Sequence, residues 1–264
     1  EQGKLASAFA NFINNLSGLD WRIAITTTDV TNGNGGKIRK FGDSGPYFIS
    51  STTPNAMTLL QTYIVTGTNG SGSERGLTAI QNFIDRTQSA SSTTTTKVNG
   101  KNVTTVTATN QNEKDFYRPE AVFSTVVVTD SDEAAYDTKY KTAEDFLNGA
   151  APNTVVLLAK INNKTYIHHS SIALPNDTDC KATSEEYGVT YYNVSQLTGG
   201  TNASICSADY GSQLKNFAST IVTKITQQTL DCSPVDANKD GAVDVAITYT
   251  LNGSTTVYTV PATQ

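Results

Sequence analysis

Acidic side chains follow directly on a run of valines in the middle of the chain. The stretch FSTVVVTDSDE, residues 123–133, ends in Asp130, Asp132 and Glu133, with hydroxyl side chains between them. Carboxylates and hydroxyls, without a cysteine or a well-placed histidine, suit a hard cation such as Mg²⁺ or Ca²⁺. In an open parallel sheet, ligands bind beyond the carboxyl ends of the strands, which is where these acids would lie. A solvated loop at the end of a strand is the alternative interpretation.

A second polar loop, TGTNGSGSERG at residues 66–76, precedes an expected helix. Its glycines allow close approach of the backbone, and the hydroxyls of Thr68, Ser71 and Ser73 can bind a metal directly or through water. Ser71 and Glu74 stand three residues apart, as in a capping box. A flexible turn that ends in a helix cap is therefore the alternative interpretation of this loop.

A third polar stretch, DANKDGAVD, resembles the opening of an EF-hand loop. Asp236, Asn238 and Asp240 occupy positions 1, 3 and 5, and a glycine follows. Ile247 stands where the loop should close with an acid. These three residues are a second candidate calcium site, and a tight polar hairpin is the alternative.

Other chemistries find less support in the sequence. His168 and His169 are adjacent in an expected strand, so they should face opposite sides of a sheet and cannot both bind one metal. No G-x-S-x-G elbow and no G-K-[ST] motif occurs. A metal-assisted hydrolase would have to combine the acids of residues 130–133 with a further acid, for which Asp29 is the obvious choice.

The composition narrows the classes of partner. The 264 residues are 16% charged and carry a net charge of −5, with no cluster of Lys and Arg, so we expect no nucleic-acid partner. No run of 18 apolar residues occurs, so we expect no membrane span. A surface polar through hydroxyls and amides is typical of secreted, cell-surface or periplasmic proteins. We find no signal peptide, which fits a mature or trimmed form.

The three cysteines favour one disulfide in an oxidising compartment. None belongs to a C-x-x-C pair. We expect Cys180 to pair with Cys206, which leaves Cys232 free or paired outside this chain. Three reduced thiols are the alternative.

Apolar spacing and turn residues divide the chain into alternating helices and strands. Helices are expected at 4–16, 54–66, 71–86, 141–150 and 207–225, the last with Ser207 as its N-cap. Strands are expected at 21–30, 45–50, 121–130 and 165–174, and residues 152–162 fit either type.

This alternation predicts an α/β fold over residues 1–226, with a doubly wound, mostly parallel sheet flanked by helices. An Asn-Gly pair at 99–100 predicts a hairpin insertion at about 88–112. Residues 227–264 are expected to form a small β appendage.

The order of these pieces resembles a von Willebrand factor type A domain of the bacterial secreted type. The resemblance rests on DWRIAITTTD, GTNGSGSERGLTA, RPEAVFSTVVVTDSDE and LTGGTNASICSADYGSQLKNFA, and it covers roughly residues 1–225. It implies a Rossmann-like sheet with a divalent cation at its top. In that family the ligands come from a D-x-S-x-S motif, a Thr or Ser before a later helix, and an Asp after the fourth strand. On this chain the resemblance assigns the Asp to Asp130 and the Thr or Ser to Ser73, with Thr68 and Ser71 left as alternatives.

The chain departs from the family in one respect. D-x-S-x-S occurs nowhere, and in the family it would lie just upstream of Glu1. A missing central strand would leave two apolar edges unpaired. We therefore expect this strand to come from a trimmed segment or from outside this chain. Loss of the motif together with the metal is the other explanation.

The resemblance implies a metal-ion-dependent adhesion domain rather than an enzyme. A Mg²⁺, Ca²⁺ or Mn²⁺ ion would keep an open coordination position, and an exposed carboxylate of a partner protein or surface ligand would complete it. Thr68, Ser71, Asp132 and Glu133 are the residues expected to contact that partner. A structural or assembly module without metal and a metal-assisted hydrolase are the alternatives.

Overall fold

The structure is a computed structural model that describes most of the chain. The described residues are 2–67, 69–90, 92–98, 101–107, 109–133, 140–148, 157–161, 165–226, 245–251 and 254–260. The chain divides into two compact units, the first spanning Glu1–Ile225 and the second Thr226–Gln264.

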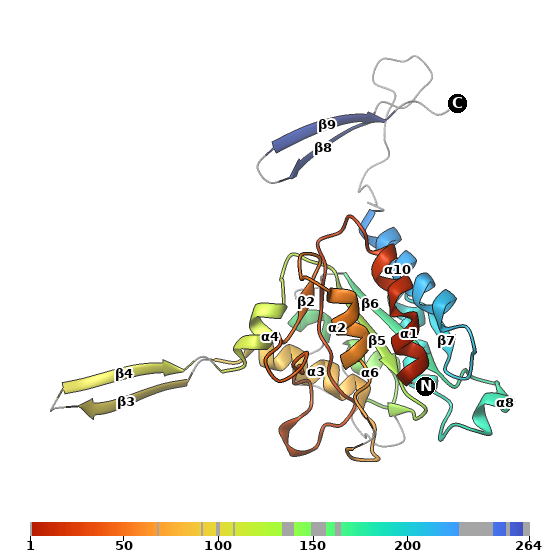
Figure 1. The fold of residues 1–264 in the computed structure, drawn as a ribbon, viewed down its shortest axis with the longest axis horizontal. Coiled ribbons are helices and arrows are strands. Elements are labelled where there is room, and N and C mark those ends of the chain that lie inside the picture. The colour runs from red at the N-terminus through yellow and green to blue at the C-terminus, as the bar shows by residue number, and fades with distance from the viewer. Residues whose placement is uncertain are drawn as a thin grey trace. The chain divides into compact units, whose positions relative to one another are not determined.

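A parallel sheet of three strands runs through the first unit, in the order β5-β6-β7 (Figure 1). The strands are β5 (Phe123–Val128), β6 (Tyr166–Ile172) and β7 (Asn202–Ser204). Phe123 pairs with Tyr166, and Ser170 pairs with Asn202. Every residue of β6 is buried, as expected for a parallel strand covered on both faces. The structure thus confirms the α/β class and the parallel strands, while the finer doubly wound topology stays a prediction.

Helices cover both faces of this sheet. Successive strand residues point to opposite faces, so Tyr166 packs in one apolar cluster and Ile167 in the other. The first cluster is formed with α3 (Gly76–Gln88), α6 (Ala143–Asn148), α7 (Leu157–Lys160) and α9 (Val189–Thr198). The second is formed with α1 (Gln2–Asn15), α2 (Ala56–Tyr63) and α10 (Tyr210–Thr226).

The expected N-terminal helix is confirmed as α1. Leu5, Phe9, Phe12 and Leu16 are all buried, as their spacing along one helical face predicts. The expected helix at 207–225 is confirmed as α10, but Ser207 is not its N-cap. Asp209 takes that place, because its Oδ1 accepts a hydrogen bond from the backbone nitrogen of Ser212 at 2.9 Å.

The expected strand at 21–30 forms over only two residues. It contributes β1 (Arg22–Ile23), which pairs antiparallel with β2 (Ile49–Ser50). A 3₁₀ turn, η1 (Thr31–Gly33), follows. Within the described residues no strand lies on the other side of β1, so residues 24–27 form no sheet ladder there.

The predicted hairpin insertion is confirmed as β3 (Ser92–Val98) and β4 (Lys101–Thr107), in register from Ser92↔Thr107 to Val98↔Lys101. Asn99 and Gly100 lie outside the described residues. A short helix, α4 (Gln111–Phe116), follows. Asn110 anchors the base of the insertion, since it accepts from Arg86 Nη1 at 3.0 Å and donates to Ser89 Oγ at 2.9 Å.

The predicted disulfide is confirmed. Cys180 in α8 (Thr178–Lys181) is bonded to Cys206, just beyond β7, with the two Cα atoms 5.5 Å apart. Cys232 lies outside the described residues.

The described residues of the second unit form an antiparallel hairpin. It consists of β8 (Val245–Leu251) and β9 (Ser254–Val260), in register from Val245↔Val260 to Leu251↔Ser254. The candidate calcium ligands Asp236, Asn238 and Asp240 lie outside the described residues, so that site stays a prediction.

Candidate functional site at the carboxyl edge of the sheet

Glu133 connects the loop after β5 to the first turn of α3. Its Oε2 accepts from the backbone nitrogen of Leu77 at 2.8 Å and from the hydroxyl of Tyr191 at 2.9 Å. Its Oε1 accepts from the nitrogen and the hydroxyl of Thr78 at 3.0 and 2.7 Å. The first backbone N–H groups of a helix need such acceptors. A glutamate distant in sequence therefore caps α3.

The capping box expected from Ser71 and Glu74 is wrong. Helix α3 begins at Gly76, too late for these residues to cap its first turn. Ser71 Oγ instead accepts from the backbone nitrogen of Ser73 at 3.1 Å within the loop. Glu74 turns toward the sheet and accepts a hydrogen bond from the hydroxyl of Thr129.

Asp132 caps α9 in the same way as Glu133 caps α3. Its Oδ1 accepts from the backbone nitrogen of Thr190 at 3.0 Å, and its Oδ2 accepts from the Thr190 hydroxyl at 2.9 Å. Burial raises the pKa of both the Asp132 and the Glu133 carboxyl, although the hydrogen bonds oppose this shift. Both side chains are buried and bound to helix ends. Their expected contact with a partner stays untested, and the structure gives them a role in holding the fold.

Asp130 differs from the other two acids of this loop. Its backbone oxygen accepts from the nitrogen of Glu186 at 2.9 Å, which fixes the main chain. The side chain is half-buried, and its carboxylate accepts no hydrogen bond from any described residue. Asp130 is thus the acid of the DSDE stretch whose oxygens are left available within the described structure.

Further carboxylates lie close to Asp130. Burial raises the pKa of Glu74, and the negative charges of Asp130 and Glu185 raise it further, while the bond from Thr129 lowers it. Ser131 Oγ donates to Glu185 Oε2 at 2.8 Å. Among the described residues, neither Glu74 nor Asp130 forms an ion pair with a basic side chain. Like charges gathered in this way favour a bound cation.

The loop of residues 66–76 reaches the same edge. Gln2, at the start of α1, donates to the carbonyl of Gly67 at 3.0 Å and accepts from its nitrogen at 2.9 Å. Asp29 forms a β-bridge with Glu74. The Asp29 carboxylate accepts two bonds from Thr31, which lower its pKa. Thr68 lies outside the described residues.

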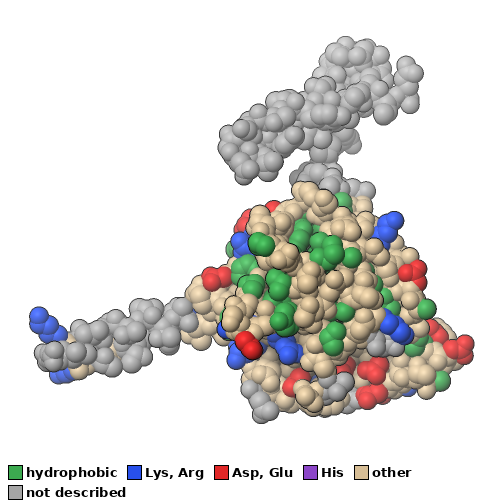
Figure 2. Space-filling view, in the orientation of Figure 1, with side chains coloured by type: hydrophobic (Ala, Val, Ile, Leu, Met, Phe, Trp, Pro, Cys, Tyr) green, Lys and Arg blue, Asp and Glu red, His purple; other side chains and the backbone are tan. Residues whose placement is uncertain are grey.

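Glu74 therefore has neighbours on two sides of this edge. Its main chain forms a β-bridge with Asp29, and its carboxyl group lies near that of Asp130. Acidic side chains gather along the lower edge of the first unit in Figure 2, the edge at which α1 begins in Figure 1. Sequence reasoning identified Asp29 and Asp130 but missed Glu74 and Glu185 as neighbours. A glutamate placed just before a helix in an alternating α/β pattern is the signal that could have found Glu74.

The two histidines lie on opposite faces of β6, as expected. The His168 ring stacks on Tyr191, and its Nδ1 lies 2.8 Å from the hydroxyl of Thr125. The His169 ring stacks on Phe217, and its Nδ1 accepts from the nitrogen of Thr201 at 3.0 Å. Burial lowers their pKa values to about 3 and about 4, so both are neutral at physiological pH.

Within the described residues, no three His, Cys, Asp or Glu side chains are grouped so that they could hold a metal. A cation at Asp130 would therefore take its other ligands from hydroxyls such as that of Ser73, from water, or from residues outside the described ranges. Hydroxyl, carboxylate and water oxygens are the ligands that Mg²⁺ and Ca²⁺ prefer.

No family model, no curated protein and no solved structure matches this chain. None of the helices in the described residues is both long enough and apolar enough to cross a bilayer.

Proposed function

We propose that the first unit is a metal-ion-dependent binding domain of the von Willebrand factor A type. A divalent cation binds at Asp130 and grips a carboxylate of a partner protein or surface ligand. The observation that carries this proposal is the contrast within one loop. Asp132 and Glu133 are bound to helix ends, whereas the Asp130 carboxylate has no hydrogen-bond donor among the described residues.

The electrostatics of this edge support a cation. Glu74 and Asp130 repel each other, and Glu74 is partly desolvated. A Mg²⁺, Ca²⁺ or Mn²⁺ ion would relieve that repulsion, with Ser73 as a hydroxyl ligand or a ligand through water. An incomplete set of protein ligands leaves a position that a partner's carboxylate can fill.

The alternative is a structural or assembly module without metal. The lack of three grouped metal ligands within the described residues favours this alternative. Titration calorimetry with Mn²⁺ separates the two functions. We expect saturable Mn²⁺ binding by the wild-type protein and at least tenfold weaker binding by Asp130→Asn. The control Asp43→Asn alters an exposed aspartate elsewhere and should bind Mn²⁺ as the wild type does. Equal Mn²⁺ binding by all three proteins, or none by the wild type, would reject the metal-dependent function.

A further inference from the structure

A cavity of about 490 Å³ lies between residues 20–29 and strand β5. We call this cavity the slot. On one side it is lined by residues from Asp20 to Asp29, and on the other by Val122 to Val128. Among the described residues β5 has one strand neighbour, β6, so its other edge faces the slot.

Both walls of the slot present backbone groups that lack a strand partner. The backbone nitrogens of Phe123 and Thr129 donate to carbonyls on the β6 side of the strand, at 3.1 and 3.2 Å. The N–H and C=O groups of the alternate residues Ser124, Val126 and Val128 therefore point away from β6 and into the slot. Opposite them, the carbonyls of Trp21 and Ile25 accept from Ser51 and Arg39, at 3.1 and 2.8 Å. The backbone N–H and C=O groups of the alternate residues Arg22, Ala24 and Thr26 therefore face the slot. Backbone N–H and C=O groups along the edge of a sheet need hydrogen-bond partners, from another strand or from water.

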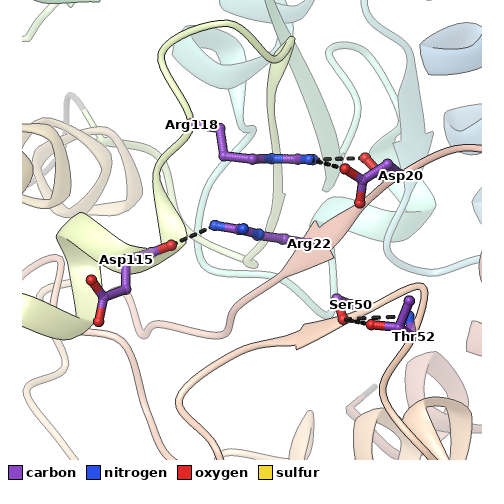
Figure 3. A network of polar contacts seen from close by, with 6 residues as sticks. All are labelled: Asp20, Arg22, Ser50, Thr52, Asp115 and Arg118. Atoms are coloured by element: carbon purple, nitrogen blue, oxygen red, sulfur yellow. Dashed lines mark hydrogen bonds and ion pairs between the residues drawn. The ribbon is translucent and has the colours of Figure 1, made fainter. Parts of the chain in front are cut away.

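The two walls run in the same direction. At their amino ends, Arg118 donates to the carboxylate and the carbonyl of Asp20, and Arg22 Nη1 donates to the carbonyl of Asp115 at 2.5 Å (Figure 3). At their carboxyl ends, Glu74 contacts both Asp29 and Thr129. These contacts bridge the slot at each end. A strand that lies between the walls and parallel to them would complete one continuous parallel sheet.

The slot is apolar on both faces. Leu5, Phe9 and Phe12 of α1 line one face, and Ile80 and Phe83 of α3 line the other. A strand inside the slot therefore needs apolar side chains on both of its own faces. Because β5 is six residues long, an occupant of about six residues would match it.

The position of α1 indicates where the occupant is joined. Gln2 lines the slot and binds Gly67, at the carboxyl end of both walls. A strand that runs parallel to β5 would finish beside this point and pass into α1 through a short loop. Strand, α1 and β1 would then form the parallel strand–helix–strand unit that is common in α/β folds.

We propose that an apolar β-strand, located ahead of Gln2 in the same polypeptide, fills the slot and pairs with β5 and with residues 22–26. The loop between this strand and α1 then lies at the edge that carries Asp130. The proposal rests on the slot and does not depend on metal binding.

Amide hydrogen exchange on engineered extensions tests the proposal. One extended protein carries six Val and Ile residues and a short Gly/Ser linker ahead of Glu1. A matched control carries the same extension with proline at alternate strand positions, which removes donors. We expect the apolar extension alone to slow exchange at Ser124, Val126 and Val128 on the order of tenfold or more, in a protein that stays monomeric.

Equal exchange in the two extended proteins would overturn the proposal. So would slow exchange at these amides in the chain without an extension. If that protection accompanied a concentration-dependent dimer, a second copy would be the occupant. If it appeared in a monomer, residues within 1–264 would fill the slot. Because the readout uses no cation, its failure is distinct from failure of metal binding.

Discussion

Oε2 of Glu133 lies 2.8 Å from the backbone nitrogen of Leu77, across 56 residues of sequence. This bond connects the loop after β5 to the N-terminus of α3, and the neighbouring Asp132 makes the equivalent connection to α9. The loop that carries Asp130 is therefore held to two helices, α3 and α9, by the buried caps that Glu133 and Asp132 provide.

Replacement of Glu133 should destabilise the fold strongly. Glu133→Ala removes the acceptor of four hydrogen bonds and leaves buried donors unsatisfied, so we expect a loss of about 3 kcal/mol in the free energy of unfolding. Glu133→Gln keeps the shape and one acceptor oxygen, and should cost about half as much. Urea denaturation measures both. Glu120→Ala, at an exposed glutamate, is the control and should change stability by less than about 0.5 kcal/mol. Similar losses for Glu133→Ala and Glu120→Ala would contradict the capping role.

Asp132 and Thr190 should be energetically coupled. In a double-mutant cycle, Asp132→Ala and Thr190→Val each remove the hydrogen bond between the Thr190 hydroxyl and the Asp132 carboxylate. The bond from the Thr190 backbone nitrogen is lost in Asp132→Ala only. We expect an interaction energy of about 1 kcal/mol, because the pair is buried and in direct contact. Additive effects of the two substitutions would show that the hydroxyl bond contributes nothing.

The buried histidines should make the protein less stable in mild acid. In the unfolded chain each binds a proton near its ordinary pKa of 6.5, whereas in the folded chain the pKa values fall to about 3 for His168 and about 4 for His169. The unfolded state then binds more protons in acid than the folded state does. The stability that the two neutral histidines contribute is therefore fully present above pH 6.5 and is lost as the pH falls toward 4. Each histidine contributes a slope of about 1.4 kcal/mol per pH unit.

A His169→Asn variant isolates this effect from the carboxyl groups. The asparagine oxygen can still accept from Thr201, but no proton is taken up on unfolding. Between pH 6 and 5, its unfolding free energy should decline less steeply than that of the wild type by about 1.4 kcal/mol per pH unit. Raised carboxyl pKa values, as at Glu133, act in the opposite direction but are common to both proteins. Parallel pH profiles would mean that His169 is not buried in its neutral form.

The disulfide between Cys180 and Cys206 should stabilise the folded first unit. Cys180 and Cys206 are separated by 26 residues, and a crosslink over such a loop restricts the unfolded chain by about 3 kcal/mol. The double substitution Cys180→Ser with Cys206→Ser should reduce the unfolding free energy by about that amount. Dithiothreitol should then weaken the wild type but leave the double variant unchanged. Equal sensitivity of both proteins to the reductant would contradict the assignment.

Local signals in the sequence predicted several elements well. The apolar spacing of α1, the valines of β5, and the Asn-Gly pair between β3 and β4 each specify their element through neighbouring residues. The cysteine pairing was also predicted correctly. These features depend on contacts within one element or on few possible partners.

Contacts across long separations could not be predicted in the same way. Glu133 meets α3 and Asp132 meets α9 only because the parallel sheet brings their ends to one edge. The capping box at Ser71 and Glu74 satisfied a local pattern, yet the helix begins later, where Glu133 supplies the acceptor. The buried face of α9 also lacks a purely apolar pattern, since the polar residues Thr190 and Ser195 are buried there beside Tyr191 and Val194.

The position of a bound cation tests the central proposal most directly. Crystals of the protein should be soaked in Mn²⁺ and examined for anomalous scattering. We predict an anomalous peak within about 2.5 Å of a carboxylate oxygen of Asp130, and no such peak in the Asp130→Asn variant. An ordered Asp130 with no peak beside it at saturating Mn²⁺ would contradict metal binding at this residue.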